Sequence, residues 1–300
     1  GGRALEVAGS LGSTALSYGQ TLFEGMKAYR RGDGRVVLFR PEMHARRLAK
    51  GAERFLMPAV PERLFVAACK AVVERNAEFV PDAGSDGKGM PNALYLRPVY
   101  FGSGAALGVH PSSHYSFAVY ASPVGSYYKA SSSSASSGSA AASTPGLRLL
   151  VQHEHLRAAP GMCGAVKTAG NYAPTFLARR LATSLDCDDV LFLDRAAAAA
   201  GGGAAGEGSE DPDAARPEEC SAANFFAVLD GTLHTAALAR GTVLAGITRD
   251  SVLRWAAGAV SRGDLSGVCE GNLTWGELKA AAAAGRRGGG AVEAFCSGTG

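Results

Sequence analysis

The chain has 300 residues, of which 47% are hydrophobic and 19% charged, a composition typical of a globular protein long enough for two domains. The formal net charge is only +3 and like charges form no block, so we expect no nucleic-acid partner. The longest apolar runs fall short of the roughly 18 residues that a membrane-spanning helix needs, so we expect no membrane role.

Residues 1–125 are predicted to form a small N-terminal domain of strands and helices. Period-two alternation and β-branched or aromatic content predict strands at 18–29, 36–39, 93–101 and 115–122. Gly-Asp-Gly at 32–34 is typical of a hairpin turn. Apolar spacing of three and four residues, with Pro41 in a first helical turn, predicts helices at 41–55 and 61–79.

A Ser/Ala-rich segment at 126–146 is predicted to link this domain to a larger one at 147–300. In the larger domain we expect strands at 147–151, 190–193 and 224–229, and helices at 174–184, 250–258 and 275–284. The Ala/Gly-rich and acidic stretch at 196–217 is predicted to be a disordered surface insertion. Because the chain stops directly after an apolar stretch, we expect this domain to be truncated at its C-terminus.

The six cysteines are widely scattered, with no CxxC pair and no histidine at metal-ligand spacing. This pattern favours reduced thiols in an intracellular protein over a disulfide or zinc framework. The chain shows no leader, and a cleaved targeting segment would leave no trace. The cytoplasm, a plastid and a mitochondrion therefore all stay open as locations.

Lys167 is the first candidate for chemistry, in the segment GAVKTAGNYAP. Its small neighbours let the backbone approach a flat ligand and leave the amine accessible. Tyr172 follows five residues later and offers a phenol. A lysine in a glycine-rich loop is, however, usually a solvated surface residue, so this candidate depends on partners elsewhere in the chain.

Three further segments could supply such partners. Glu218 and Glu219 come just before an apolar strand, where one of them could supply a carboxylate to a ligand or both could be exposed loop acids. In LAGITRDSV, a turn at Gly246 would expose backbone N–H groups at a helix start, either as a phosphate cradle or as a plain capped helix. Arg46 and Arg47 are cations on the first helix or simple surface residues.

A glycine loop at 102–108 imitates a dinucleotide-binding motif, but proline and turn residues follow it instead of a helix.

Taken together, eight segments in order along the chain resemble the branched-chain amino acid aminotransferase family, a family of pyridoxal-phosphate (PLP) enzymes. They are YGQTLFEGMKAYR, LFRPEMHARRLAKGAERFLMP, LYLRPVYFG, RAAPG with GAVKTAGNYAP, DVLFLD, EECSAANFF, GTVLAGITRDSV and EAFCSGT. The resemblance implies a mixed α+β and α/β fold, namely the two-domain fold type IV of D-amino acid aminotransferase, with the cofactor at the domain interface. It also implies a homodimer.

The family's cofactor residues can be carried onto matching positions of this chain. Lys167 would hold PLP covalently, Tyr172 would bond its phenolic oxygen, and Glu219 rather than Glu218 would meet its pyridine nitrogen. The matching phosphate ligands are Arg47, Ile247, Thr248 and Thr299.

The resemblance also implies the substrates, which are L-leucine, L-isoleucine or L-valine with 2-oxoglutarate. Phe23, Tyr18 and Tyr95 match aromatic positions around the aliphatic side chain, and Arg97 matches the arginine for the distal carboxylate of glutamate. Thr299 completes a Gly-Thr pair, and Gly300, a further candidate for substrate binding, stands where the family usually has alanine.

Two alternatives stay open. A D-amino acid aminotransferase or an aminodeoxychorismate lyase shares the lysine and the glutamate, although LFEGMKAY and LYLRPVYFG favour the branched-chain enzymes. A catalytically silent, truncated relative is the other alternative, because the chain ends at Gly300. Met162 and Cys163 also depart from the family pattern close to Lys167.

Overall fold

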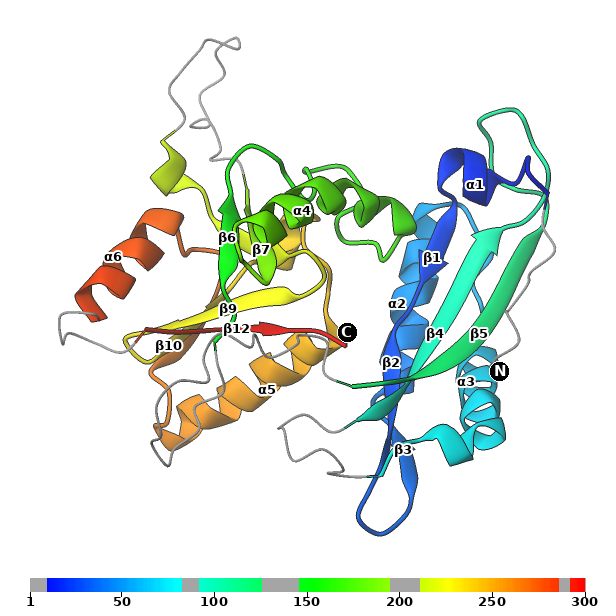
Figure 1. The fold of residues 1–300 in the computed structure, drawn as a ribbon, viewed down its shortest axis with the longest axis horizontal. Coiled ribbons are helices and arrows are strands. Elements are labelled where there is room, and N and C mark those ends of the chain that lie inside the picture. The colour runs from blue at the N-terminus through cyan, green and yellow to red at the C-terminus, as the bar shows by residue number, and fades with distance from the viewer. Residues whose placement is uncertain (1–9, 83–91, 126–145, 195–210, 286–291, 300) are drawn as a thin grey trace. The chain divides into compact units, whose positions relative to one another are not determined.

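The computed structural model describes residues 10–82, 92–125, 146–194, 211–285 and 292–299 (Figure 1). The chain folds into two compact units. The first comprises residues 1–126 together with 166–170, and the second comprises residues 127–165 and 171–300. The predicted linker lies almost wholly outside the described residues, as does the predicted insertion up to residue 210.

The first unit is built on an antiparallel sheet whose described strands are ordered β1-β4-β2-β3, with β5 paired to β4. Its elements are α1 (Thr14–Tyr18), β1 (Thr21–Phe23), β2 (Met26–Arg30), β3 (Val36–Leu38), α2 (Pro41–Arg54), α3 (Glu62–Arg75), η1 (Ala77–Phe79), β4 (Ala93–Gly102) and β5 (Tyr115–Val124). The predicted hairpin between β2 and β3 is confirmed, as is the helix that opens at Pro41.

The predicted strand over 18–29 is wrong at its start and in its middle. The chain is helical up to Tyr18, and Gly19 ends α1 in the left-handed region at φ 67°. The rest lies along β4 in one register, from Phe23↔Val99 to Met26↔Leu96, but is interrupted between β1 and β2. The Glu24 N–H donates to the Pro98 carbonyl at 2.8 Å, and proline has no N–H to return the bond.

The two faces of β4 have different neighbours because side chains alternate along a strand. Leu94 and Leu96 are fully buried in a core with α2 and α3, which includes Phe65. Tyr95 and Arg97, on the opposite face, are only half-buried. One face of this sheet therefore provides stability, while the other is available for function.

The second unit is built on a mixed sheet in the order β11-β10-β9-β8-β7-β6, with β12 also paired to β9. Its strands and helices are β6 (Leu149–Gln152), α4 (Phe176–Ser184), β7 (Asp189–Leu193), β8 (Pro217–Cys220), β9 (Asn224–Leu229), β10 (Thr232–Thr235), α5 (Ile247–Arg262), β11 (Gly267–Glu270), α6 (Trp275–Gly285) and β12 (Val292–Ser297). Its short 3₁₀ helices are η4 (Ala173–Thr175), η5 (Pro212–Ala214) and η6 (Leu238–Arg240), and η3 (Ala169–Asn171) begins in the 166–170 segment of the first unit.

Helices cover both faces of this sheet. Phe192 packs with α4 and Phe226 with α5, whereas Phe225, the next residue on β9, packs with Leu278 of α6 on the other face. Strands buried on both faces read as continuous apolar runs, as VLFL at 190–193 of β7 does.

Two sequence expectations need correction here. The predicted insertion extends too far, because η5 and the start of β8 lie within 211–217 and Pro217 is buried. The helix predicted at 250–258 begins three residues earlier, at Ile247, and ends at Arg262.

Candidate functional site

The segment that carries Lys167 packs as an added strand against β1 of the first unit, although the sequence places it in the second domain. The Phe23 N–H donates to the Lys167 carbonyl at 3.1 Å. The Thr168 hydroxyl donates to the Thr21 carbonyl at 2.8 Å, and Leu22 and Thr168 form a β-bridge. These bonds fix the backbone of Lys167 and hence the direction of its side chain.

The side chain of Lys167 lies over an aromatic ring that it shares with a second cation. Lys167 Nζ is 4.8 Å from the centroid of Phe23, and the guanidinium carbon of Arg97 is 4.6 Å from the same centroid. Arg97 Nη2 also donates to the Tyr95 hydroxyl at 3.1 Å. The structure therefore brings together four of the predicted site residues on the half-buried face of the first sheet.

This cluster suits a small molecule that carries both an apolar part and an anionic part. Arg97 Nε is buried and finds no hydrogen-bond partner within the described residues. A buried donor without a partner is costly unless a ligand pairs it. Gly25 is also required here, because a Cβ at this position would lie 2.0 Å from the Tyr95 hydroxyl.

On the opposite face of the same sheet, Glu24 is buried between two residues of α2. Arg47 Nε and Nη2 donate to its carboxylate at 2.8 and 2.6 Å, and His44 Nδ1 lies 2.8 Å from Glu24 Oε2. Burial by itself raises the pKa of Glu24, but the charge and hydrogen bonds of Arg47, with those of His44, lower it to about 2. Burial lowers the pKa of His44 despite the neighbouring carboxylate.

The sequence did not single out Glu24 or His44. Arg47, predicted as a phosphate ligand, has two guanidinium nitrogens committed to Glu24. Tyr18, predicted near the aliphatic substrate, instead donates its hydroxyl hydrogen to the Leu107 carbonyl and is 42% exposed. Both assignments stay predictions.

In the second unit, Glu219 is a buried carboxylate held by three groups. Asn224 Nδ2 donates to Glu219 Oε1 at 2.6 Å, and the Leu244 N–H donates to the same oxygen at 3.1 Å. Arg157 Nη1 lies 2.5 Å from Glu219 Oε2, and both side chains are 3% exposed. Arg157 begins the RAAPG motif, but no sequence pattern pairs it with Glu219.

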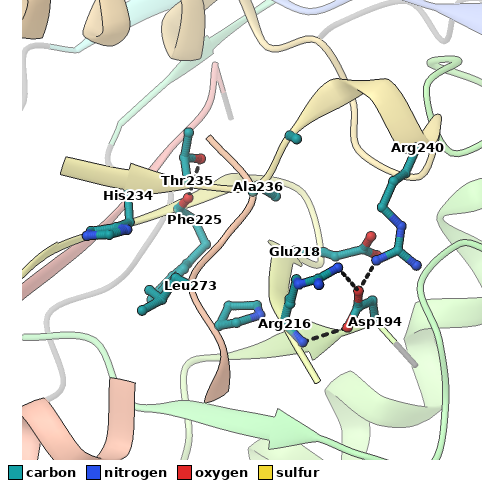
Figure 2. A pocket seen from close by; sticks show the side chains of 12 residues that line it. Asp194, Arg216, Glu218, Phe225, His234, Thr235, Ala236, Arg240 and Leu273 are labelled. Carbon is teal, nitrogen blue, oxygen red and sulfur yellow. Dashed lines mark hydrogen bonds and ion pairs between the residues drawn. The ribbon is translucent and has the colours of Figure 1, made fainter. Parts of the chain in front are cut away.

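Glu218 points to the other side of β8. It accepts a hydrogen bond from the Thr242 hydroxyl and lies beside Asp194, on which Arg216 and Arg240 converge (Figure 2). Burial raises the pKa of Glu218, and the hydrogen bond from Thr242 offsets this only in part. The two adjacent acids thus have separate surroundings.

Asn224 lies between the start of α5 and Glu219: its side chain packs against Gly246 and donates a hydrogen bond to Glu219. A Cβ on Gly246, the N-cap residue of α5, would lie 2.0 Å from Asn224 Oδ1, so this position needs glycine. Among the described residues, no side chain caps α5 at Gly246. Ile247 and Thr248 follow in the first turn, the end of a helix at which backbone N–H groups and the helix dipole favour an anion.

The remaining predicted residues are placed individually. Tyr172 is half-buried, and its carbonyl accepts hydrogen bonds from the Thr175 N–H and hydroxyl at 3.0 and 2.7 Å. Thr299 follows the end of β12 and is half-buried. Gly300 lies outside the described residues.

Comparison with solved structures identifies the fold. The chain matches the T.th. branched-chain amino acid aminotransferase, solved in complex with N-(5'-phosphopyridoxyl)-L-glutamate, with a TM-score of 0.66 and 27% identity. The match covers 98% of this chain and 77% of that chain. The fold is therefore that of the fold type IV PLP enzymes, which confirms the predicted fold class.

Residues 21–205 match the family model described as amino-transferase class IV. The chain belongs to this family of class IV aminotransferases. It is 38% identical over 284 residues to branched-chain-amino-acid aminotransferase 5, chloroplastic, of Arabidopsis thaliana, which covers 95% of this chain and 56% of the relative. It is 42% identical over 238 residues to branched-chain-amino-acid aminotransferase 1, mitochondrial, of the same organism, which covers 79% and 53%.

The chain thus spans about half the length of these two curated relatives. Within the described ranges, we find no helix with the length and apolar character needed to cross a membrane.

Proposed function

We propose that the protein transfers the amino group of L-leucine, L-isoleucine or L-valine to 2-oxoglutarate through PLP, giving a branched 2-oxo acid and L-glutamate. The observation that carries this proposal is the placement of Lys167 and Arg97 over the single ring of Phe23. One cation is a primary amine able to bind a carbonyl carbon, and the other is a guanidinium able to pair a carboxylate.

The residues present fit PLP. Its pyridine nitrogen needs a carboxylate partner, and Glu219 is a buried carboxylate 2.5 Å from Nη1 of Arg157. Its phosphate needs backbone N–H groups and a helix N-terminus, which α5 offers at Ile247 and Thr248. When bound, PLP acts as an electron sink for the bonds at the substrate α-carbon and carries the amino group between the two half-reactions.

In the first unit, Lys167 Nζ would hold the cofactor and would then act as the base that moves the proton at the substrate α-carbon. Phe23 and Tyr95 bury the aliphatic side chain, a contribution of roughly 1.5–3 kcal/mol for a leucine-sized group. Arg97 pairs the distal carboxylate when glutamate is the substrate. One pocket thereby accepts two unlike side chains.

In the second unit, the Glu219 carboxylate would serve the ring nitrogen, and Asn224 orients that carboxylate. Tyr172 would donate its phenolic hydrogen to the ring oxygen. Thr299 and the N-terminus of α5 would bind the phosphate, and Arg47 keeps the phosphate role that the family resemblance implies. These assignments follow the family positions, and the burial of Glu219 supports the first of them.

A substrate panel tests the proposal. We expect turnover of L-leucine, L-isoleucine and L-valine with 2-oxoglutarate, and far weaker turnover of D-alanine or aminodeoxychorismate. A preference for D-alanine would assign the chain to the D-amino acid enzymes, and a PLP-loaded protein without any turnover would support a silent relative.

Assembly and location are further parts of the proposal. A homodimer is the form that the family resemblance implies, and light scattering of the purified protein would detect it. Relatives named chloroplastic and mitochondrial support a plastid or a mitochondrion as the site of action.

A further inference from the structure

Two cysteines of the second unit lie close to bonding distance. Cys220 Sγ is 3.2 Å from Cys296 Sγ, although the residues are 76 positions apart in sequence. A disulfide bond is about 2.0 Å long, so the two sulfur atoms need to approach by only about 1.2 Å. Both cysteines are free thiols in the structure.

The sheet itself holds the two thiols at this separation. β8 and β12 both pair with β9 at adjacent positions, through Glu219↔Asn224 and Cys296↔Phe225. The Cys220 N–H donates to the Ala223 carbonyl at 2.8 Å, which fixes the turn from β8 into β9. The sulfur atoms meet in the core under α6, so their contact does not depend on a flexible segment.

The two thiols differ in burial and in pKa. Cys220 is fully buried, and its hydrogen bond to Cys296, together with burial, raises its pKa. Cys296 is partly exposed, and the same hydrogen bond lowers its pKa. Since the thiolate is the attacking species, Cys296 is suited to react first and Cys220 to react second.

We propose that Cys220 and Cys296 form a reversible dithiol–disulfide site that a low-molecular-weight disulfide oxidises. The Cys296 thiolate attacks one sulfur of the dissolved disulfide, which forms a mixed disulfide and releases one thiolate. The Cys220 sulfur then attacks Cys296 Sγ, which closes the protein disulfide and releases the second thiolate. Two protein thiols are oxidised, one dissolved disulfide is reduced to two thiols, and both protons pass to the released thiolates.

The bond would join two segments with proposed roles in cofactor binding. Glu219 directly precedes Cys220, and Thr299 follows three residues after Cys296. This consequence rests on the proposed function: the oxidised form is expected to bind PLP several-fold more weakly, because closing the bond shifts the segment that carries Glu219. The disulfide itself is independent of any activity.

Peptide mapping tests the site directly. The purified chain is equilibrated with oxidised glutathione, quenched with acid, alkylated and digested. We expect a linked peptide pair containing residues 220 and 296, an intact mass lower by two hydrogens, and full reversal by dithiothreitol. Cys187→Ser should keep the link, whereas Cys220→Ser and Cys296→Ser should each lose it.

The proposal would be overturned if Cys296 carried glutathione while Cys220 remained a free thiol that the alkylating reagent modifies. The wild-type map decides the matter even if a serine variant fails to fold. Unchanged PLP affinity in the linked form would overturn the proposed consequence for the cofactor alone. Absence of transaminase activity would count against the proposed function and leave the disulfide result intact.

Discussion

Arg47 binds both oxygens of the Glu24 carboxylate, from Nε at 2.8 Å to Oε1 and from Nη2 at 2.6 Å to Oε2. Glu24 is completely buried and Arg47 is 11% exposed in its side chain. A buried, two-point ion pair of this kind ties β1 and β2 to α2, the helix that covers the core face of the sheet. Losing one partner leaves an uncompensated charge in the core.

The pair predicts a specific acid sensitivity. The pKa of Glu24 is lowered from 4.5 to about 2, so its stabilisation is fully present above about pH 4.5 and is lost as pH falls towards 2. The shift corresponds to a loss on the order of 3 kcal/mol over that window. Urea unfolding between about pH 6 and 2.5, a range that covers most of that window, should show this slope in the wild type and a shallower slope in Glu24→Gln.

His44 adds a separate loss of stability as pH falls below 6.5, because burial lowers its pKa. The comparison therefore uses the difference between the slopes of the two proteins and not the wild-type slope alone. Glu62→Gln serves as the matched control, since Glu62 pairs with Arg46 at an exposed site and should change stability by less than about 1 kcal/mol. Equal slopes in wild type and Glu24→Gln would contradict the assigned role of the buried pair.

The adjacent acids of β8 provide a matched pair of variants. Glu219→Gln removes the carboxylate that is proposed to stabilise the protonated pyridine nitrogen. It also leaves Arg157 buried without that partner. We expect turnover to fall by about two orders of magnitude or more. Glu218→Gln should keep most of the turnover, because Glu218 faces Thr242 and Asp194. Steady-state rates with saturating PLP measure both, and equal losses would refute the division of roles.

Replacing Arg97 should raise the KM for L-glutamate and leave the KM for L-leucine nearly unchanged. Arg97→Met removes the guanidinium proposed for the distal carboxylate of glutamate but keeps an apolar side chain over Phe23. We expect the KM for L-glutamate to rise by about 10- to 100-fold, as loss of a charge-assisted hydrogen bond implies. The KM for L-leucine should change little, and an equal rise for both substrates would argue for general damage. Arg46→Met, at an exposed site, is the control.

Gly246 should not tolerate a side chain. A Cβ there would overlap Asn224 Oδ1, so Gly246→Ala must displace the residue that holds Glu219 in place. Overpacking of this kind typically costs about 1–3 kcal/mol. A Cβ on Gly146 would meet no atom within 4 Å, and the φ of Gly146 lies outside the positive range, so Gly146→Ala should be nearly neutral. Thermal unfolding and PLP titration of both variants check the contrast.

Local patterns predicted many of the individual elements. The helix at Pro41 and the strands β4 and β9 carry strong spacing or composition signals, and the structure confirms them. The sequence missed α1 because Thr14–Tyr18 has no apolar periodicity, and it missed the four-residue strand β10, which is defined by its pairing with β9 and β11.

The sequence predicted those site residues that lie in recognisable motifs, but not the contacts between motifs. The resemblance nominated Lys167 and Glu219, but their partners Phe23 and Arg157 are contacts made by folding between distant segments. No spacing rule connects such pairs. Glu24 could have been suspected as an acid within an apolar strand region, since a carboxylate is rarely buried without a partner.

The central claim is that Lys167 holds PLP covalently, and borohydride reduction tests it most directly. The protein is incubated with PLP, reduced, digested and analysed by mass spectrometry, with Lys27→Ala and Lys167→Ala treated alike. We expect one phosphopyridoxyl group on Lys167 in the wild type and in Lys27→Ala, and none in Lys167→Ala. Labelling of another lysine in the wild type, or equal PLP incorporation in Lys167→Ala, would contradict it.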